Sequence, residues 1–223
     1  MSNGVTAWSY SRYNDYKQCP LKFKLKHLDR LPDPGGPAMQ RGNLIHKLAE
    51  DYTVGKIKAL PPELKNFKEE FKQLRSMKPM VEQAWGFRRD WTHNGRNDWF
   101  GGDVWLRSKA DVFVVYDDDT GDLIDHKTGK KYETNKEQVE LFACTAFMRV
   151  PTLTHVTTRL WYLDLVEDNE VVAEYTAKDA ENIKKDWEKK VQPMFNDKKF
   201  APRPNDKCHW CTFSKAKGGP CKF

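Results

Sequence analysis

The segment from Leu106 to Lys130 constrains the fold most, because two apolar runs in it flank a short acidic stretch. Residues 112–115 (Val-Phe-Val-Val) and 123–124 (Leu-Ile) have the composition of core strands, and residues 117–121 (Asp-Asp-Asp-Thr-Gly) have that of a turn. The sequence therefore predicts an antiparallel hairpin whose strands lie in the core of a sheet.

Charged residues interrupt this apolar hairpin. A pairing centred on Asp118 places Asp111 opposite Asp125, because both are equally far from position 118. Side chains alternate between the faces of a strand, so Asp125 and Lys127 point the same way. Two carboxylates and an ammonium on one face suit a divalent-metal site that hydrolyses phosphodiesters, with the lysine beside the reacting water or phosphate.

Two alternatives stand beside this interpretation. A pairing shifted by one residue would send Asp111 to the other face. An Asp-x-Lys pair at a strand end is also commonly a solvated surface pair. The apolar residues on both sides favour the functional interpretation, because charges within core strands need a reason.

Composition allows several classes of protein and disfavours others. The 223 residues suffice for one core, and we expect a single domain spanning residues 1–223. The net charge of +6 is compatible with nucleic-acid binding but does not require it. No apolar run reaches the ~20 residues of a membrane span, and the first residues lack the pattern of a signal peptide. We therefore expect a cytoplasmic protein without membrane contact.

Four of the five cysteines have positions typical of metal ligands. Cys208 and Cys211 form a Cys-x-x-Cys motif, Cys221 follows, and Cys19 lies near the other end of the chain. Four thiolates can close a tetrahedral zinc site or hold an iron–sulfur cluster, and either would join the N- and C-terminal segments. Cys144 lies on an amphipathic helix and is expected in the core.

The periodicity of apolar residues predicts an alternation of helices and strands. We expect helices over 9–17, 38–52, 62–77, 136–149 and 178–195, and strands over 81–89, 104–116, 123–128, 154–166 and 170–176. In the second helix, Leu44, Ile45, Leu48 and Ala49 form the expected buried stripe. This order predicts an α/β fold with a central mixed sheet flanked by helices.

Five segments spread over the chain form a pattern that is known from one family. They are Trp8–Ser11 with Tyr16–Pro20, Arg41–His46, Ala110-Asp111, Ile124–Gly129 and the terminal cysteines. Together they resemble the PD-(D/E)xK nuclease superfamily in its RecB-like branch, especially the iron–sulfur exonucleases related to RecB, AddB and the CRISPR-adaptation nucleases. The resemblance implies a restriction-endonuclease-like core.

The resemblance also assigns roles to individual residues. It implies that His46, Asp111 and Asp125, with the backbone carbonyl of His126, bind Mg²⁺ or Mn²⁺. It makes Lys127 the catalytic lysine, and it places Gln138 in the site from the following helix. The cysteines at 19, 208, 211 and 221 would hold a 4Fe-4S cluster.

Two positions depart from the family pattern. Phe142 replaces a tyrosine that often follows the glutamine, and the gap between Cys211 and Cys221 is longer than in the clustered members. The longer gap keeps Zn²⁺ as an alternative to the iron–sulfur cluster. Glu82, in the strand before the hairpin, has two interpretations, a further metal ligand or a residue on a solvated face, and we expect the second.

The function implied is a metal-dependent DNA nuclease, most simply an exonuclease in replication, recombination or repair. It would act on single-stranded DNA or duplex ends, with a recombination or helicase protein as a partner. The alternatives are a non-cleaving DNA-binding subunit of a recombination or helicase complex, and a restriction-type endonuclease. Basic segments 22–26 and 130–131 are candidate phosphate contacts.

Overall fold

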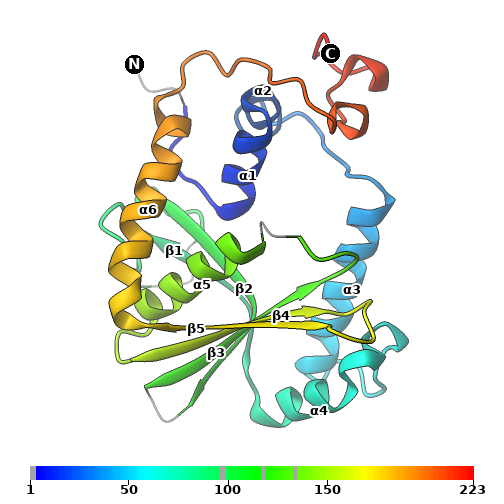
Figure 1. Cartoon of the computed structure of the whole chain (residues 1–223), viewed down its shortest axis with the longest axis vertical. Helices are drawn as coiled ribbons and strands as arrows, with labels where there is room; N and C mark the ends of the chain where they lie inside the picture. The colour runs from blue at the N-terminus through cyan, green and yellow to red at the C-terminus, as the bar shows by residue number, and fades with distance from the viewer. Residues whose placement is uncertain (1–3, 96–98, 117–118, 133–134) are drawn as a thin grey trace.

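A five-stranded mixed sheet forms the centre of the protein (Figure 1). The computed structural model describes residues 4–95, 99–116, 119–132 and 135–223. The strands lie in chain order: β1 (Met80–Phe87), β2 (Leu106–Tyr116), β3 (Thr120–Lys127), β4 (His155–Tyr162) and β5 (Glu170–Thr176). Only β3 and β4 pair in parallel, and the other neighbours are antiparallel. The structure therefore confirms the predicted α/β fold with a mixed sheet.

Helices precede the sheet, connect its strands and follow it. They are α1 (Tyr10–Gln18), α2 (Pro20–Phe23), the π-helix η1 (Lys24–Leu28), α3 (Pro37–Thr53), the 3₁₀ helix η2 (Pro62–Phe67), α4 (Lys68–Met77), α5 (Asn135–Arg149), α6 (Ala177–Asn196), and the short 3₁₀ helices η3 (Cys208–Trp210) and η4 (Lys215–Lys217). None of the helices within the described ranges has both the length and the apolar character needed to cross a membrane.

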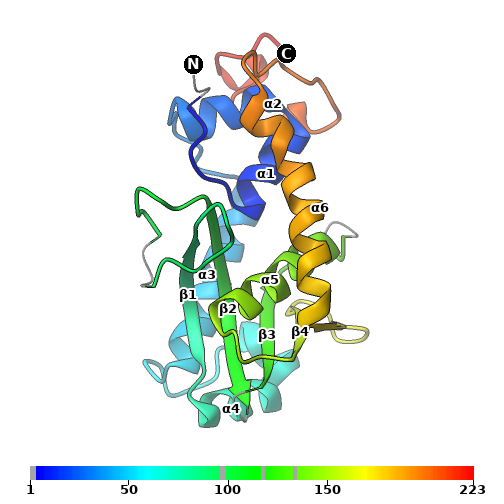
Figure 2. The same cartoon turned by 90° about the vertical axis from the view of Figure 1, so that its left-hand side faces the viewer.

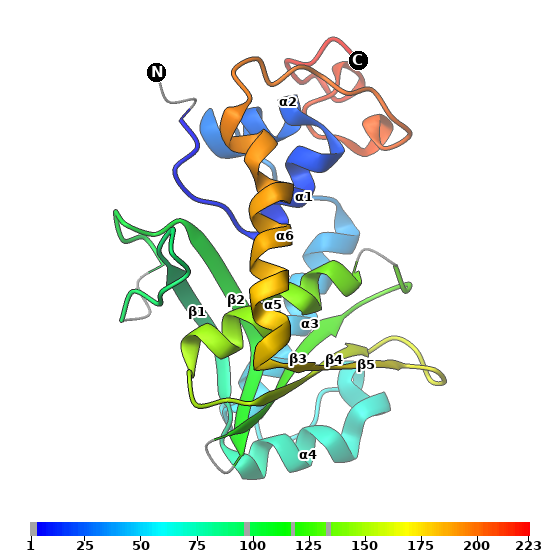
Figure 3. The same ribbon diagram turned by 60° about the vertical axis from the view of Figure 1, so that its left-hand side comes forward.

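The two faces of the sheet are covered by different helices. Helices α5 and α6 cover one face, and Figure 3 shows both in front of the strands. Trp8, which bridges to Leu106 at the start of β2, stacks on Trp187 of α6 on this side. Helices α3 and α4 cover the other face, where Ile45 and Phe71 pack with Val112. The central strands β2, β3 and β4 are thus covered on both faces, which explains their apolar residues, whereas no residue of β5 is fully buried.

The pairing of β2 with β3 confirms the register predicted for the central hairpin. Val112 pairs with Ile124 and Tyr116 with Thr120, so the pairs are centred on position 118 as expected. Positions 117 and 118 of the expected turn lie outside the described residues. The ladder ends at the Val112–Ile124 pair, which leaves Asp111 and Asp125 where the two strands separate.

Three local expectations were wrong. Leu44 is 58% exposed, although its helix buries Ile45 and Ala49 as expected. The helix expected over 62–77 is divided into a 3₁₀ turn and α4, and residues 20–28, for which no helix was expected, are helical. Pro20 at the first helical position is compatible with such a start, because its missing N–H would have no partner there.

Candidate active site

The strand β2 changes its pattern of side-chain directions at Asp111. Ala110 and Phe113 are three residues apart, yet both pack in the core on the α5 and α6 side, whereas Val112 packs on the α3 side. Across from Asp111 on β1, Glu82 has a left-handed backbone conformation (φ 54°), which is unusual for a residue within a strand. The irregularity directs the Asp111 side chain towards α3.

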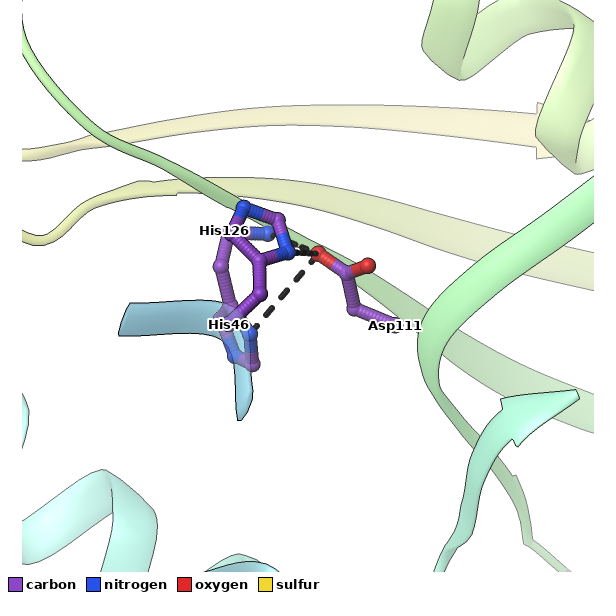
Figure 4. Close-up of side chains that lie close together, drawn as sticks. All are labelled: His46, Asp111 and His126. Atoms are coloured by element: carbon purple, nitrogen blue, oxygen red, sulfur yellow. Dashed lines mark hydrogen bonds and ion pairs between the residues drawn. The ribbon is translucent and has the colours of Figure 1, made fainter. Parts of the chain in front are cut away.

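The Asp111 carboxylate joins β3 to α3 (Figure 4). Its Oδ2 accepts a hydrogen bond of 2.7 Å from the backbone N–H of His126 and lies 3.2 Å from Nδ1 of His46. The Nδ1 atom of His126 lies 3.7 Å from the same oxygen. One ligand atom from each of these three residues lies within 4.8 Å of the others. The side chains therefore form a compact group that can hold a cation.

The three groups set one another's protonation. Burial would raise the pKa of Asp111, but the hydrogen bond from His46 and the charges of both histidines outweigh it and keep that pKa well below its usual value. Burial would lower the pKa of His46, but its contact with Asp111 outweighs burial and raises it. Burial lowers the pKa of His126 to about 4. At neutral pH, Asp111 is ionised and the ring of His126 is neutral, which are the states that metal ligands need.

Of the two ring nitrogens of His126, Nδ1 faces Asp111, so Nδ1 is the atom that can bind a cation with it. The Nε2 atom of His126 is buried and has no hydrogen-bond partner among the described residues. The His126 ring packs against Phe71 and Trp161, which hold its position. The residues present therefore fit a divalent cation, and they include the side chain of His126, for which the sequence implied only the backbone carbonyl.

Asp125, Lys127 and Gln138 form a second group at the end of β3. Lys127 Nζ lies 2.5 Å from Oδ2 of Asp125 and donates a hydrogen bond of 2.8 Å to Oε1 of Gln138. The amide Nε2 of Gln138 donates to the other oxygen of Asp125 at 3.2 Å. Burial raises the pKa of Asp125; the charge of Lys127 opposes this rise and that of Asp111 adds to it. The contacts among these three side chains fix the direction of the Lys127 side chain.

The charged groups lie close enough to interact, but Asp111 reaches them from a direction that alternation along β2 does not predict. Asp125 and Lys127 are in contact, as alternation along β3 predicts. Asp111, however, bonds to α3 on one face of the sheet, whereas Asp125 bonds to α5 on the other. The charge of Asp111 nevertheless raises the pKa of Asp125, so the two carboxylates lie close enough to interact. Strict alternation failed because β2 is irregular at Asp111.

Glu82 was expected on a solvated face, but it lies beside the candidate site. A hollow of about 490 Å³ is lined by His46, Glu82, Lys109, Asp111 and Thr128 among others. Glu82 forms an ion pair with Lys109, and its side chain is only 22% exposed. A position next to the metal ligands was the less favoured interpretation of Glu82, and it depends on the backbone irregularity shared by β1 and β2.

Asp164 was not anticipated, and it connects the parts of the site. It lies just beyond β4, where its carboxylate accepts two hydrogen bonds from Arg41 of α3, at 2.6 and 2.8 Å. It also accepts the N–H of Gly129, two residues after Lys127, at 2.7 Å. Asp164 therefore holds the helix that carries His46 against the end of β3. Both partners of this carboxylate, Arg41 and Gly129, lie in segments that the sequence already marked as part of the site.

The four predicted cysteine ligands lie around one hollow near the chain ends. Cys19, Cys208, Cys211 and Cys221 all line it. Backbone N–H groups of Arg203 and Asn205 donate to the sulfurs of Cys19 (3.4 Å) and Cys208 (3.3 Å). Burial raises the pKa of Cys211, and the nearby thiols of Cys19 and Cys208 add to the rise. Cys144 is buried in the core, as expected.

The fold and the site define an α/β protein that gathers carboxylates, histidines and a lysine where its central strands separate. The model of the PD-(D/E)XK nuclease superfamily matches residues 7–216. The chain therefore belongs to the PD-(D/E)XK nuclease superfamily, whose members hydrolyse nucleic acids.

Solved structures that match this chain have low sequence identity to it. One, described as a "Putative exonuclease" from Eubacterium rectale, is 12% identical with a TM-score of 0.53, and the match covers 93% of this chain and 88% of that one. Another, the crystal structure of SSO0001, is 14% identical with a TM-score of 0.43 and coverages of 98% and 88%. The chain matches none of the curated proteins. These similarities concern the fold alone.

Proposed function

We propose that the chain is a divalent-metal-dependent deoxyribonuclease that degrades DNA from its ends. The observation that supports this most is the position of two groups at the end of β3: the ligand group of His46, Asp111 and His126, and the lysine held by Asp125 and Gln138. A superfamily member that only bound DNA would have no need to keep both.

His46, Asp111 and His126 would hold Mg²⁺ or Mn²⁺, with Asp125 contributing from the other side of the strand gap. The bound cation would polarise the scissile phosphate and acidify a water molecule. Two imidazoles among the ligands favour Mn²⁺ over Mg²⁺, since imidazole is softer than carboxylate. Asp111 is suited to this role because it is already ionised.

Lys127 would place its positive charge beside the reacting phosphate and orient the attacking water. A lysine on a flexible stem needs fixed partners to hold one direction, and Asp125 and Gln138 supply them. Preorganised charge of this kind stabilises the negative charge that develops in the transition state. Gln138 acts here by positioning Lys127 and Asp125.

We also propose that the cysteines hold an iron–sulfur cluster. Cys19, Cys208, Cys211 and Cys221 all line one hollow near the chain ends. The backbone N–H groups directed at Cys19 and Cys208 are also typical of cluster surroundings. A brown sample with broad absorbance near ~400 nm would support the cluster, and a colourless sample containing zinc would contradict it.

The nuclease proposal is tested with Asp111→Asn and Lys127→Ala proteins on end-labelled DNA in Mn²⁺. We expect both to lose at least about 100-fold in rate. Asp186→Asn and Lys189→Ala, at exposed positions of α6, are matched controls that should keep the parent rate. Parent activity in Asp111→Asn would contradict the proposal.

The form of the DNA separates the proposal from its alternatives. Linear DNA should be degraded from its ends while closed circular DNA persists. Cleavage of circles would identify an endonuclease. Binding of DNA without cleavage in either metal would identify a non-cleaving subunit.

A further inference from the structure

The net charge of the chain is concentrated at its C-terminal end. Residues 198–223 contain seven basic residues and one acidic residue, a difference that equals the +6 of the whole chain. In the described structure, none of these seven cations forms an ion pair with a carboxylate, whereas many cations elsewhere do. Unpaired cations gathered in one segment are typical of a surface that binds phosphates.

A large aromatic side chain projects from the same segment. Trp210, in η3, is 77% exposed, and its ring lies 4.7 Å from that of His209. It lines a hollow of about 560 Å³, together with Lys207 and residues of the loop before α3. An indole left in water beside lysines offers a face on which a base can stack.

This hollow adjoins the candidate active site. Met39, in the first turns of α3, lines both this hollow and the one that contains His46 and Asp111. Figure 2 shows the C-terminal segment beside α1 and α2, and α3 leads from there towards the sheet. Three acidic residues line the hollow: Asp15 and Asp33 pair with Lys22 and Lys26, whereas Asp206 forms no ion pair among the described residues.

We propose that residues 198–223 guide an unpaired DNA strand to the catalytic hollow. A base stacks on Trp210, phosphates contact Lys207 and its basic neighbours, and the strand continues over Met39 to Asp111. Bases inside a duplex are stacked on one another and cannot stack on Trp210. The surface of residues 198–223 therefore distinguishes a single strand from a duplex. This inference rests on the proposed nuclease function and assigns single-stranded ends as its substrate.

Binding is measured by fluorescence anisotropy of a labelled thymidine oligonucleotide, with Ca²⁺ as the divalent ion. Trp210→Ala is expected to weaken binding roughly 5- to 100-fold, the range for loss of one stacked base. Trp210→Phe, which keeps an aromatic face, should stay near the parent affinity. Val166→Ala, at a position equally exposed in the β4–β5 connection, is the control for loss of a surface apolar group.

Further measurements test whether Trp210→Ala acts only by disturbing the structure. Blunt duplex DNA should bind equally to the parent and to Trp210→Ala, and iron or zinc content should be unchanged by the substitution. Lys207→Gln should reduce the slope of log affinity against log salt by about 0.7, the value for one phosphate on a single strand. Equal single-strand affinity in Trp210→Ala and the parent would overturn the proposal, as would an equal loss for the duplex.

Hydrolysis separates this inference from the nuclease proposal. A small diester such as bis(p-nitrophenyl) phosphate reaches only the catalytic hollow, so Trp210→Ala should hydrolyse it at the parent rate. The same variant should degrade oligonucleotides longer than about 4 nucleotides more slowly than the parent. If the parent hydrolyses neither substrate, the nuclease proposal fails. The binding experiment still decides whether residues 198–223 bind a single DNA strand.

Discussion

At the scale of single residues, His126 has the most unusual environment of the site. Its ring is buried between Phe71 and Trp161, and no described residue bonds its Nε2 atom. A buried polar atom without a partner is costly for the fold. The other nitrogen, Nδ1, lies 3.7 Å from Oδ2 of Asp111 and is the atom placed to bind a cation.

A His126→Phe protein separates metal binding from the packing of the ring. The substitution keeps an aromatic ring between Phe71 and Trp161, so the free energy of unfolding should change by less than about 1.5 kcal/mol. Affinity for Mn²⁺ should fall roughly 10-fold or more, because a ligand is lost. Titration calorimetry and denaturant unfolding measure the two quantities.

The loss of Mn²⁺ affinity in the His126→Phe protein should not depend on pH in the neutral range. Because the pKa of His126 is about 4, its ring is already neutral throughout this range. His46, whose pKa is raised, must release a proton to bind metal, so its contribution should grow as the pH rises. Unchanged affinity in His126→Phe would leave only the backbone carbonyl as a ligand, as the sequence implied.

Residues on regular strands were predictable, and those at the irregularity were not. Asp125 and Lys127 follow from alternation along β3, and their contact was anticipated. The direction of Asp111 and the position of Glu82 depend on a local change in β1 and β2, which leaves no mark in apolar periodicity. Asp164 was missed because a single aspartate after a strand has no distinctive pattern.

At the scale of elements, α3 must be held in register with β3 for the site to form. It carries His46, whereas β3 carries Asp125 and Lys127. The bidentate pair of Arg41 with Asp164, and the bond from Gly129 to the same carboxylate, connect the two elements. The pair holds His46 at a fixed distance from the end of β3.

An Arg41→Ala protein should therefore bind metal less well without losing much stability. Arg41 is 53% exposed, so its ion pair should contribute no more than about 1 kcal/mol to folding. Affinity for Mn²⁺ should fall roughly 10-fold, as it does when residues that orient metal ligands are removed. Lys47→Ala is a close control, since Lys47 has the same exposure but pairs with Glu50 and Asp51 of its own helix. Equal affinities in the two variants would contradict an orienting role for Arg41.

Helices and strands with clear apolar periodicity were predicted close to their observed ends. Strand β5 has the expected bounds, and α5 begins one residue earlier than expected. The helix expected over 62–77 failed at Phe67, whose backbone (φ −125°, ψ 35°) leaves the helical region although its side chain keeps the apolar spacing. Leu44 matched the apolar spacing of the buried stripe of α3, but its side chain stays exposed. The spacing of apolar residues alone does not predict where a helix backbone breaks, or how much of an apolar face other elements cover.

At the scale of the whole molecule, the two ends of the chain lie together. Phe200 stacks on Phe23, and Arg203 donates to the backbone of Lys17 at 2.6 Å. Thr212 donates to Asp33 at 2.8 Å. Cys19 and the three C-terminal cysteines lie between these contacts, so a metal centre there would fasten one terminus to the other.

Loss of one cysteine ligand should release the C-terminal segment while the sheet stays folded. In Cys208→Ser we expect lower metal content, a lower Tm and rapid cleavage by trypsin within 198–223, because the metal bonds are a large share of what orders so short a segment. Far-ultraviolet circular dichroism should change little, since the sheet and α3 to α6 have their own apolar cores. Cys144→Ala, in the core and away from the other cysteines, should keep the metal. If Cys208→Ser retains the metal content, Tm and trypsin resistance of the parent, the cysteines do not fasten the chain ends.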